Sequence, residues 1–308
     1  MSTSEKTSAS AVRTIDSLDA RAVLILFGCC ACWGVNQTAI KIANAGISPI
    51  LQAGLRSLLA GALVFAWSAA RRVRLFERDR TLAPGLIAGL LFAFEFLVLY
   101  VGLGATTASR GVVFLYLAPF VVAIGAHYFV PGDRLTWLKM IGLSAALLGL
   151  MIAMGEGFAA PGRPTLAGDL LCVLSAILWG TTTVFIRSTA LKTAPAEKTL
   201  FYQLAVSGVV LVPASWLAGE AGVADPSLRV AFAFAYTVVL VAFISYIAWF
   251  WLVRHYPPTL ISAFTFLAPV FGVAAGNLML SEPFTPSLAG ALALVASGIY
   301  LVNRPQGS

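Results

Sequence analysis

Charged residues are scarce in this sequence. Asp, Glu, Lys and Arg make up 11% of the 308 residues and hydrophobic residues 59%, with a mean hydropathy of +0.90. A soluble domain carries about 25% charged residues, so this composition excludes that class. The apolar residues form continuous runs of about 20, long enough to cross a bilayer, and they lack the short alternating pattern of an outer-membrane barrel. The sequence therefore predicts an all-α polytopic membrane protein.

Recognisable catalytic and metal-binding motifs are also missing. The sequence has no His-Glu-x-x-His, no paired Asp motif and no Walker loop, which argues against an intramembrane enzyme and against direct use of ATP. Its four cysteines fall inside predicted helices without the paired spacing of a zinc site. We therefore expect no cofactor and no metal. The net charge of +7 is expected to set orientation and attract anionic lipid headgroups, so no nucleic-acid partner is predicted.

Ten apolar segments are predicted to span the membrane, and the loops between them are too short for an extramembrane domain. The segments are 22–44, 48–70, 82–105, 109–130, 135–154, 167–190, 197–218, 229–252, 259–280 and 286–303.

Lys and Arg gather in alternate connections, which predicts cytoplasmic termini because cytoplasmic loops are enriched in these residues. The inner set is Lys6, Arg13, Arg21, Arg71, Arg72, Arg74, Arg78, Arg80, Arg134, Lys139, Arg187, Lys192, Lys198, Arg254 and Arg304; the outer set is Arg110, Arg163 and Arg229.

Two motifs of the first half recur in the second. "LFGCCACWGVNQTAIK" (26–41) aligns with "CVLSAILWGTTTVFIR" (172–187) through Trp-Gly, and "FLYLAPFVVAIGAHYFV" (114–130) aligns with "FTFLAPVFGVAAGNLML" (264–280) through Leu-Ala-Pro. Each half has five predicted spans, an odd number, so the halves must enter the membrane from opposite faces. This predicts a 5+5 inverted-topology repeat, which is typical of secondary transporters. The predicted parts are a cytoplasmic tail (1–21), the first repeat (22–154), a periplasmic connector (155–166), the second repeat (167–303) and a C-terminal tail (304–308).

These features together resemble the EamA-type drug/metabolite transporters over residues 22–303. The basis is the duplicated Trp-Gly, the basic residues Lys41 and Arg187 eight positions after each Trp, and a Pro in the fourth helix of each half. Within that family, "FEFLVLYVGLGATTASRGVVFLYLAP" looks most like an amino-acid exporter, and the matching residues here are Glu95 and Tyr116. The resemblance implies a bacterial inner-membrane exporter of small metabolites, with neutral or aromatic amino acids first. Export of a drug, a nucleobase or another metabolite stays open.

Glu95 interrupts an otherwise apolar helix near the depth of several other polar side chains. At 1.5 Å per residue, it lies about 20 Å from the cytoplasmic start of its helix, and Arg56 lies about 10 Å below the outer edge, at the same depth. Asn36, Gln37 and Tyr116 reach this layer too. A lone carboxylate there costs about 2.5–3.5 kcal/mol to insert. Either Glu95 binds a substrate amine or carries a proton, or it forms a structural bridge with Arg56.

Several polar and aromatic side chains lie on one face of their predicted helix, as expected for residues that line a cavity. Trp33, Asn36 and Gln37 follow the spacing of one side of a helix, and Trp179 repeats the position of Trp33. Interhelical hydrogen bonding is the alternative role for such polar residues. The candidate substrate-binding residues are Trp33, Asn36, Gln37, Arg56, Glu95, Tyr116, Trp179, Tyr246 and Trp249.

The predicted function is therefore a secondary transporter that works by alternating access through a central cavity. A channel and an intramembrane enzyme are the competing classes. The expected partners are a small-molecule substrate and membrane lipids, with coupling to a proton or to the substrate's own gradient; the oligomeric state is left open.

Overall fold

The computed structural model describes residues 17–304 apart from 78, 107, 154, 156–165 and 273–285. Regular structure in this part of the chain is helical except for one isolated β-bridge, Ile47 with Val223. The elements are α1 (Ala20–Asn44), α2 (Pro49–Ala70), α3 (Leu82–Ala105), α4 (Ala108–Leu115), α5 (Ala118–Phe129), α6 (Trp137–Ala153), α8 (Leu166–Ser188), a 3-10 turn (Ala190–Thr193), α9 (Ala196–Leu217), α10 (Leu228–Tyr236), a π-helical segment (Thr237–Ser245), α11 (Tyr246–His255), α12 (Pro258–Phe264) and α14 (Pro286–Asn303).

Six helices in the described ranges are long and apolar enough to cross a membrane: Pro49–Ala70, Leu82–Gly102, Arg110–Phe129, Leu166–Ser188, Ala196–Leu217 and Leu228–His255. Four shorter apolar helices cover Ala20–Asn36, Trp137–Ile152, Pro258–Gly272 and Gly290–Asn303. The predicted class, an all-helical polytopic membrane protein, is confirmed. The predicted span 259–280 can be followed only to residue 272, because 273–285 lie outside the described residues.

Both Leu-Ala-Pro motifs interrupt their helices. Pro119 has no N–H to donate, and the chain between α4 and α5 makes tighter bonds instead: Leu117 N–H donates to Phe114 O at 3.1 Å and Phe120 N–H to Leu117 O at 3.0 Å. The second half has the same break between α12 and the helical residues 267–272. There Ala268 N–H donates to Thr265 O at 2.9 Å. The segment predicted as one helix at 109–130 is therefore two helices around a turn.

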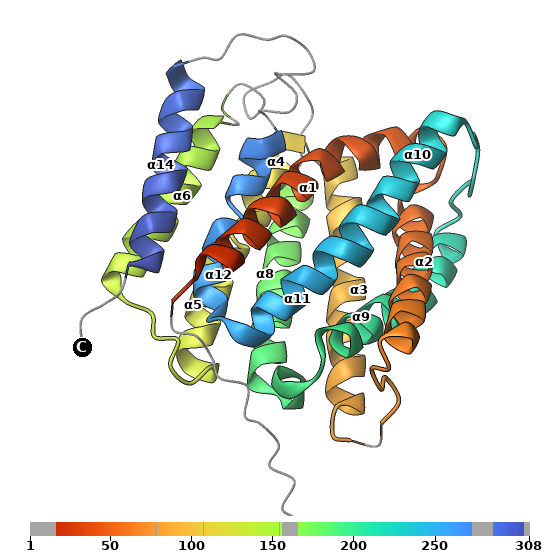
Figure 1. Ribbon diagram of the computed structural model, residues 1–308. Coiled ribbons are helices and arrows are strands. Elements are labelled where there is room, and N and C mark those ends of the chain that lie inside the picture. Colours follow the sequence, from red (N-terminus) through yellow and green to blue (C-terminus); the bar gives the residue numbers. More distant parts are fainter. Residues whose placement is uncertain are drawn as a thin grey trace, which may run out of the picture.

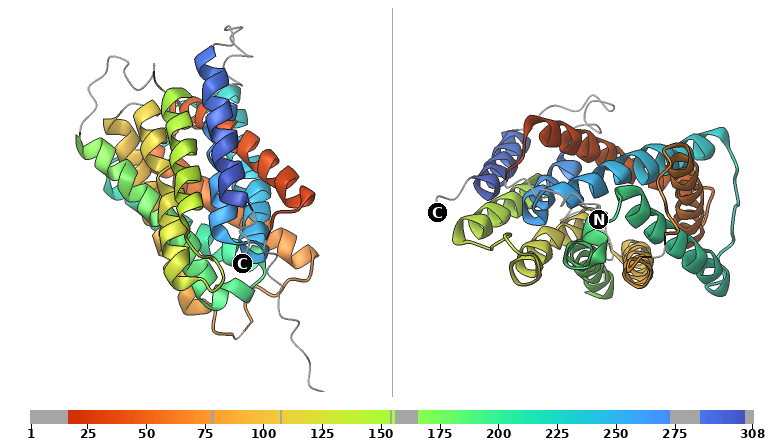
Figure 2. Two further views of the ribbon diagram at one scale, coloured as in Figure 1. Left: turned by 90° about the vertical axis from the view of Figure 1, so that its left-hand side faces the viewer. Right: turned by 60° about the horizontal axis from the view of Figure 1, so that its bottom comes forward.

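The helices form a bundle whose two sides are closed by antiparallel pairs. In Figure 1, α6 and α14 lie together at one side, and α2 and α9 lie at the other. Between these pairs, α1 and the α10–α11 rod lie in front of α3 and α8, and Figure 2 shows the same separation from other directions. Glycines permit the close approach: a Cβ placed on Gly142 of α6 would lie 2.6 Å from the carbonyl oxygen of Gly298 in α14.

The repeated Trp-Gly and Leu-Ala-Pro motifs contact each other across the halves. A Cβ on Gly34 would lie 2.6 Å from the carbonyl oxygen of Ala268, and a Cβ on Gly180 would lie 3.1 Å from that of Ala118. The glycine of each half therefore packs against the Leu-Ala-Pro alanine of the other half. The absence of a side chain after each tryptophan is what allows this backbone contact.

A second pair of contacts also joins equivalent positions of the two halves. The Ser175 hydroxyl of α8 donates to the carbonyl oxygen of Glu95 in α3 at 3.2 Å. The Cys29 thiol of α1 donates to the carbonyl oxygen of Ser245 at 3.6 Å. Cys29 stands in the sequence motif of the first half where Ser175 stands in that of the second. Glu95 and Ser245 therefore receive equivalent side-chain contacts.

Polar contacts tie the connecting segments to the helix ends. The Glu220 carboxylate accepts from the N–H groups of Ile50 and Leu51 at 3.0 and 2.9 Å, satisfying amides that the first turn of α2 leaves free. In the segment before α3, Asp79 accepts from the Lys198 ammonium at 2.7 Å. Burial raises the pKa of the Asp79 carboxyl, but hydrogen bonds from Lys198 and Thr81 outweigh that effect and lower the pKa to about 2. Asp79 is therefore ionised at neutral pH and holds this segment to α9.

The Gly34 contact can be tested against a neighbouring glycine. We expect Gly34→Ala to destabilise the protein by about 1–3 kcal/mol, because the added methyl group overlaps backbone atoms that have no rotamer to change. Gly28 lies in the same helix with nothing within 4 Å of an added Cβ, so Gly28→Ala should leave the apparent melting temperature in detergent unchanged or raised. Equal melting temperatures for the two variants would contradict the packing role of Gly34.

Candidate functional site

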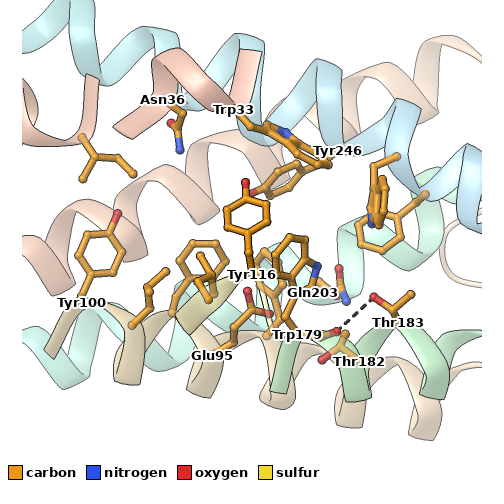
Figure 3. Close-up of a pocket in the computed structure, with 17 residues that line it drawn as sticks. Trp33, Asn36, Glu95, Tyr100, Tyr116, Trp179, Thr182, Thr183, Gln203 and Tyr246 are labelled. Atoms are coloured by element: carbon orange, nitrogen blue, oxygen red, sulfur yellow. Dashed lines mark hydrogen bonds between the residues drawn. The ribbon is translucent and has the colours of Figure 1, made fainter. Parts of the chain in front are cut away.

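A cavity of about 120 Å³ lies between helices of both halves. It is lined from α1, α3, the turn after α4, α8, α9 and α11, and Figure 3 shows these side chains converging from opposite sides. Most of its surface is aromatic or aliphatic. The lining residues are Trp33, Asn36, Ile40, Phe92, Glu95, Phe96, Leu99, Tyr100, Leu115, Tyr116, Trp179, Thr182, Thr183, Gln203, Tyr246, Trp249 and Phe250.

The cavity has a distinct polar centre and two weakly polar ends. In Figure 3, Glu95 lies close to Trp179 and Tyr116 in the middle, with Tyr100 and Asn36 towards one end and Gln203 and the threonines towards the other. Glu95 is the one acidic or basic side chain that lines the cavity in the described part of the chain, and it is 6% exposed. A single carboxyl group among aromatic faces suits, in its ionised form, a ligand that carries a positive charge.

The wall opposite Glu95 is built around Trp33. Its indole N–H donates to the Ser245 hydroxyl at 2.8 Å, and that hydroxyl donates to Val241 O at 2.7 Å. Trp33 also packs edge-to-face on Tyr246 and Trp249, with ring centroids 6.3 and 5.4 Å apart. Ser245 ends the π-helical segment, a feature that often occurs at functional sites. The indole N–H of Trp33 is therefore already hydrogen-bonded within the protein, while its ring lines the cavity.

The proline-bent turns supply the aromatic rings next to Glu95. Tyr116 lies in the turn between α4 and α5 and packs edge-to-face on Trp179 at 6.0 Å between centroids. Its ring also contacts that of Phe266, its counterpart in the other half, at 6.0 Å. Tyr116 lines the cavity, whereas the fully buried Phe266 supports it from behind.

The structure brings together seven of the nine predicted site residues. Of the other two, only Arg56 can be placed. Arg56 is 1% exposed but does not line the cavity: its guanidinium carbon lies 4.3 Å from the centre of the Phe96 ring. The described residues show no ion pair between Arg56 and Glu95 within 4.0 Å. The side chain of Gln37 lies outside what the structure describes.

Several lining residues were missed from the sequence. Phe96 and Tyr100 follow Phe92 at four-residue intervals, a spacing that places them on one helix face and that could have identified them. Gln203 carried a different signal. It is a fully buried amide in an apolar helix, and neither of its side-chain polar atoms has a hydrogen-bond partner among the described residues.

Comparison with known proteins gives the family. The model of the EamA-like transporter family matches residues 20–155 and again residues 166–304. This chain belongs to the EamA-like transporter family. Its two matches cover nearly the whole described chain, so both sides of the cavity come from EamA-like segments.

Individual relatives of this EamA-like protein are distant but aligned over almost their full length. It is 26% identical over 284 residues to the uncharacterized transporter YvbV of Bacillus subtilis, covering 92% of each chain. It is 27% identical to the uncharacterized inner membrane transporter YedA of Escherichia coli, covering 90% and 89%. A probable amino-acid metabolite efflux pump of Escherichia coli is 25% identical, covering 87% and 90%.

A solved crystal structure has the same fold. It superposes with a TM-score of 0.78 at 20% sequence identity and covers 92% of this chain and 96% of its own. The family and the fold agree in making this EamA-like protein a multi-pass membrane transporter.

The Trp33–Ser245 bond gives a prediction for the cavity wall. Ser245→Ala should lower the free energy of unfolding by about 1 kcal/mol, because the Trp33 N–H loses its acceptor. Ser297→Ala is the matched control, since Ser297 also donates to a carbonyl four residues earlier, that of Ala293, but on an exposed face. Melting in detergent measures both. A double-mutant cycle with Trp33→Phe should give a coupling of about 0.5–1.5 kcal/mol, and zero coupling would contradict the bond.

Proposed function

We propose that this EamA-like protein has ten membrane spans arranged as two inverted five-helix repeats, 22–154 and 167–303, joined by a periplasmic connector at 155–166. Two kinds of contact that occur once in each direction between the halves support this arrangement. Gly34 packs against Ala268 as Gly180 packs against Ala118. Cys29 donates to the carbonyl of Ser245 as Ser175 donates to that of Glu95. The antiparallel α2–α9 and α6–α14 pairs fit a two-fold axis in the membrane plane.

The proposed location is the bacterial inner membrane, with the tails 1–21 and 304–308 in the cytoplasm. The distribution of Lys and Arg supports this orientation, and a relative is named an inner membrane transporter. The outward faces of the helices carry large exposed apolar side chains such as Phe65, Phe232 and Leu228, and these would contact membrane lipids.

The proposed activity is export of a small amine-bearing metabolite, with neutral and aromatic amino acids as the first substrate class. The observation that carries this proposal is that Glu95 is the single acidic or basic side chain among the described residues that line the aromatic cavity between the two halves. Its carboxylate would bind the substrate ammonium while the rings of Trp33, Trp179 and Tyr246 contact the apolar part. The probable amino-acid metabolite efflux pump among the relatives supports the same class.

The size of the cavity supports a small substrate. Its volume of about 120 Å³ is close to that of an engineered cavity of roughly 150 Å³ that holds one benzene ring. In this conformation the cavity therefore accommodates one ring or a short aliphatic side chain. Transport by alternating access would open it to one side of the membrane at a time.

Two alternatives use the same cavity. Its aromatic lining would also stack a nucleobase or a flat cationic drug, which makes drug or nucleobase export the second candidate. A channel is the alternative from a different class. Coupling to a proton is proposed through Glu95, because a carboxylate can exchange a bound proton for a substrate cation.

Counterflow separates these possibilities. Purified protein in proteoliposomes is loaded in turn with a panel of amino acids, purine bases and a cationic dye, and tracer uptake of the same compound is followed. We expect saturable counterflow for at least one neutral or aromatic amino acid. Movement of only a base or dye would establish the second candidate. Tracer equilibration that neither saturates nor responds to the loaded compound would identify a channel.

Glu95 gives the direct test of the binding role. Glu95→Gln keeps the shape but removes the charge, and we expect at least a tenfold loss of counterflow, the effect of losing about 1.4 kcal/mol of ligand binding. If Glu95 also carries the coupled proton, the pH dependence of transport should disappear in this variant. Glu77→Gln is the control, because Glu77 is an exposed loop carboxylate. A folded Glu95→Gln protein with unchanged rate and pH profile would remove Glu95 from the site.

A further inference from the structure

Arg56 is buried without a hydrogen-bond partner in the part of the chain that the structure describes. It is 1% exposed, and none of its three guanidinium nitrogens has a hydrogen-bond acceptor among the described residues. Gln52, one turn earlier on the same face of α2, is 0% exposed, and neither of its amide atoms has a partner. The interior of a membrane protein offers little water to satisfy such groups. A guanidinium whose five N–H donors have no acceptor among the described residues therefore indicates a site for a ligand.

The guanidinium lies directly behind the cavity wall. Phe96 lines the cavity, and Arg56 stacks on its ring at 4.3 Å. The Phe96 ring also packs beside that of Tyr100, with ring centroids 6.4 Å apart, and Tyr100 lines the cavity together with Glu95 and Tyr246. The Tyr100 hydroxyl is another buried group without a partner among the described residues. The Phe96 ring thus separates the Arg56 guanidinium, which has no acceptor among the described residues, from the cavity that Glu95 and Tyr100 line.

We propose that Arg56 and the Tyr100 hydroxyl form a carboxylate-binding subsite that the Phe96 ring covers in this conformation. This inference rests on the proposed function and makes it more specific: the substrate is a zwitterion, with its ammonium at Glu95 and its carboxylate at Arg56. Arginine suits this task because its planar donors pair with both oxygens of a carboxylate. Phe96 and Glu95 line the same cavity, so turning the Phe96 ring aside would open the Arg56 guanidinium to the space that Glu95 faces.

A purely structural role for Arg56 explains less. Stacking on one ring is a favourable cation–π contact, but it leaves the guanidinium N–H groups without an acceptor among the described residues. A structural arginine of this kind would be paired or hydrogen-bonded, because an unpaired buried charge is costly. The two roles predict opposite effects on stability. If Arg56 serves to bind a ligand, Arg56→Gln should raise the melting temperature of the ligand-free protein or leave it unchanged. If Arg56 stabilises the fold, the same substitution should lower it.

The decisive comparison uses two ligands that differ in one carboxylate. Binding of L-phenylalanine and of phenethylamine is measured on the purified full-length wild type, on Arg56→Gln and on Arg56→Lys. Loss of a charge-assisted hydrogen bond pair should weaken L-phenylalanine binding about 10- to 100-fold in Arg56→Gln, with phenethylamine changed less than threefold. Arg56→Lys should recover part of the loss. Equal weakening of both ligands would overturn the subsite.

A third probe separates failure of the subsite from failure of the proposed substrate. Benzoate has a carboxylate and no amine, and we expect it to bind Phe96→Ala, in which the cover is removed, at least tenfold more tightly than Phe96→Ala combined with Arg56→Gln. If no amino acid moves in counterflow but benzoate binding still depends on Arg56, the subsite stands and the amino-acid proposal falls. If benzoate binds both variants equally or binds neither, the subsite is overturned whatever the transported substrate.

Discussion

Close backbone contact at two glycines is the constraint on which the central cavity depends. Gly34 and Gly180 each follow a tryptophan, and each packs against the alanine carbonyl of a proline-bent turn from the other half. A side chain at either position would separate the helices from these turns. The contacts hold α1 and α8 at a distance at which Trp33 and Trp179 reach the same cavity. In a membrane, where burial of apolar surface does little to hold helices together, such packing is a main source of association.

The two halves have equivalent backbone contacts but different side chains at equivalent positions, and this difference makes one side of the cavity more polar than the other. Glu95 and Ser245 receive equivalent contacts on their carbonyl oxygens, from Ser175 and Cys29. The Ser245 hydroxyl is used within the protein as the acceptor for Trp33. The Glu95 carboxylate is instead left facing the cavity. One difference between the two repeats, Glu95 in place of Ser245, therefore gives one side of the cavity a carboxyl group, and charges interact strongly where water is scarce.

Buried polar groups without partners gather around this cavity. Gln52, Arg56, Tyr100 and Gln203 come from three helices, and each has at least one buried atom without a hydrogen-bond partner in the described part of the chain. Unsatisfied groups of this kind are costly in an apolar interior. Unpartnered polar atoms also occur at helix ends in this part of the chain, for example on Ser68 and Asn303, whereas Glu220 and Asp79 accept hydrogen bonds there. Among the described residues, the unpartnered atoms of Asn36, Tyr100 and Gln203 are the ones whose side chains line the cavity and are available to a ligand there.

The sequence by itself determined the all-helical membrane class, because apolar runs of membrane-spanning length act locally. It also determined that Trp33 and Asn36 share a helix face, since that follows from helical periodicity. The depth argument placed Arg56 and Glu95 in one layer, but depth does not specify the direction in which a helix faces. Only the packing of α2 against α3 decided that Arg56 lies behind Phe96. The roles of Gln203 and Ser245 likewise depend on contacts between segments far apart in the chain, so the tertiary structure alone revealed them.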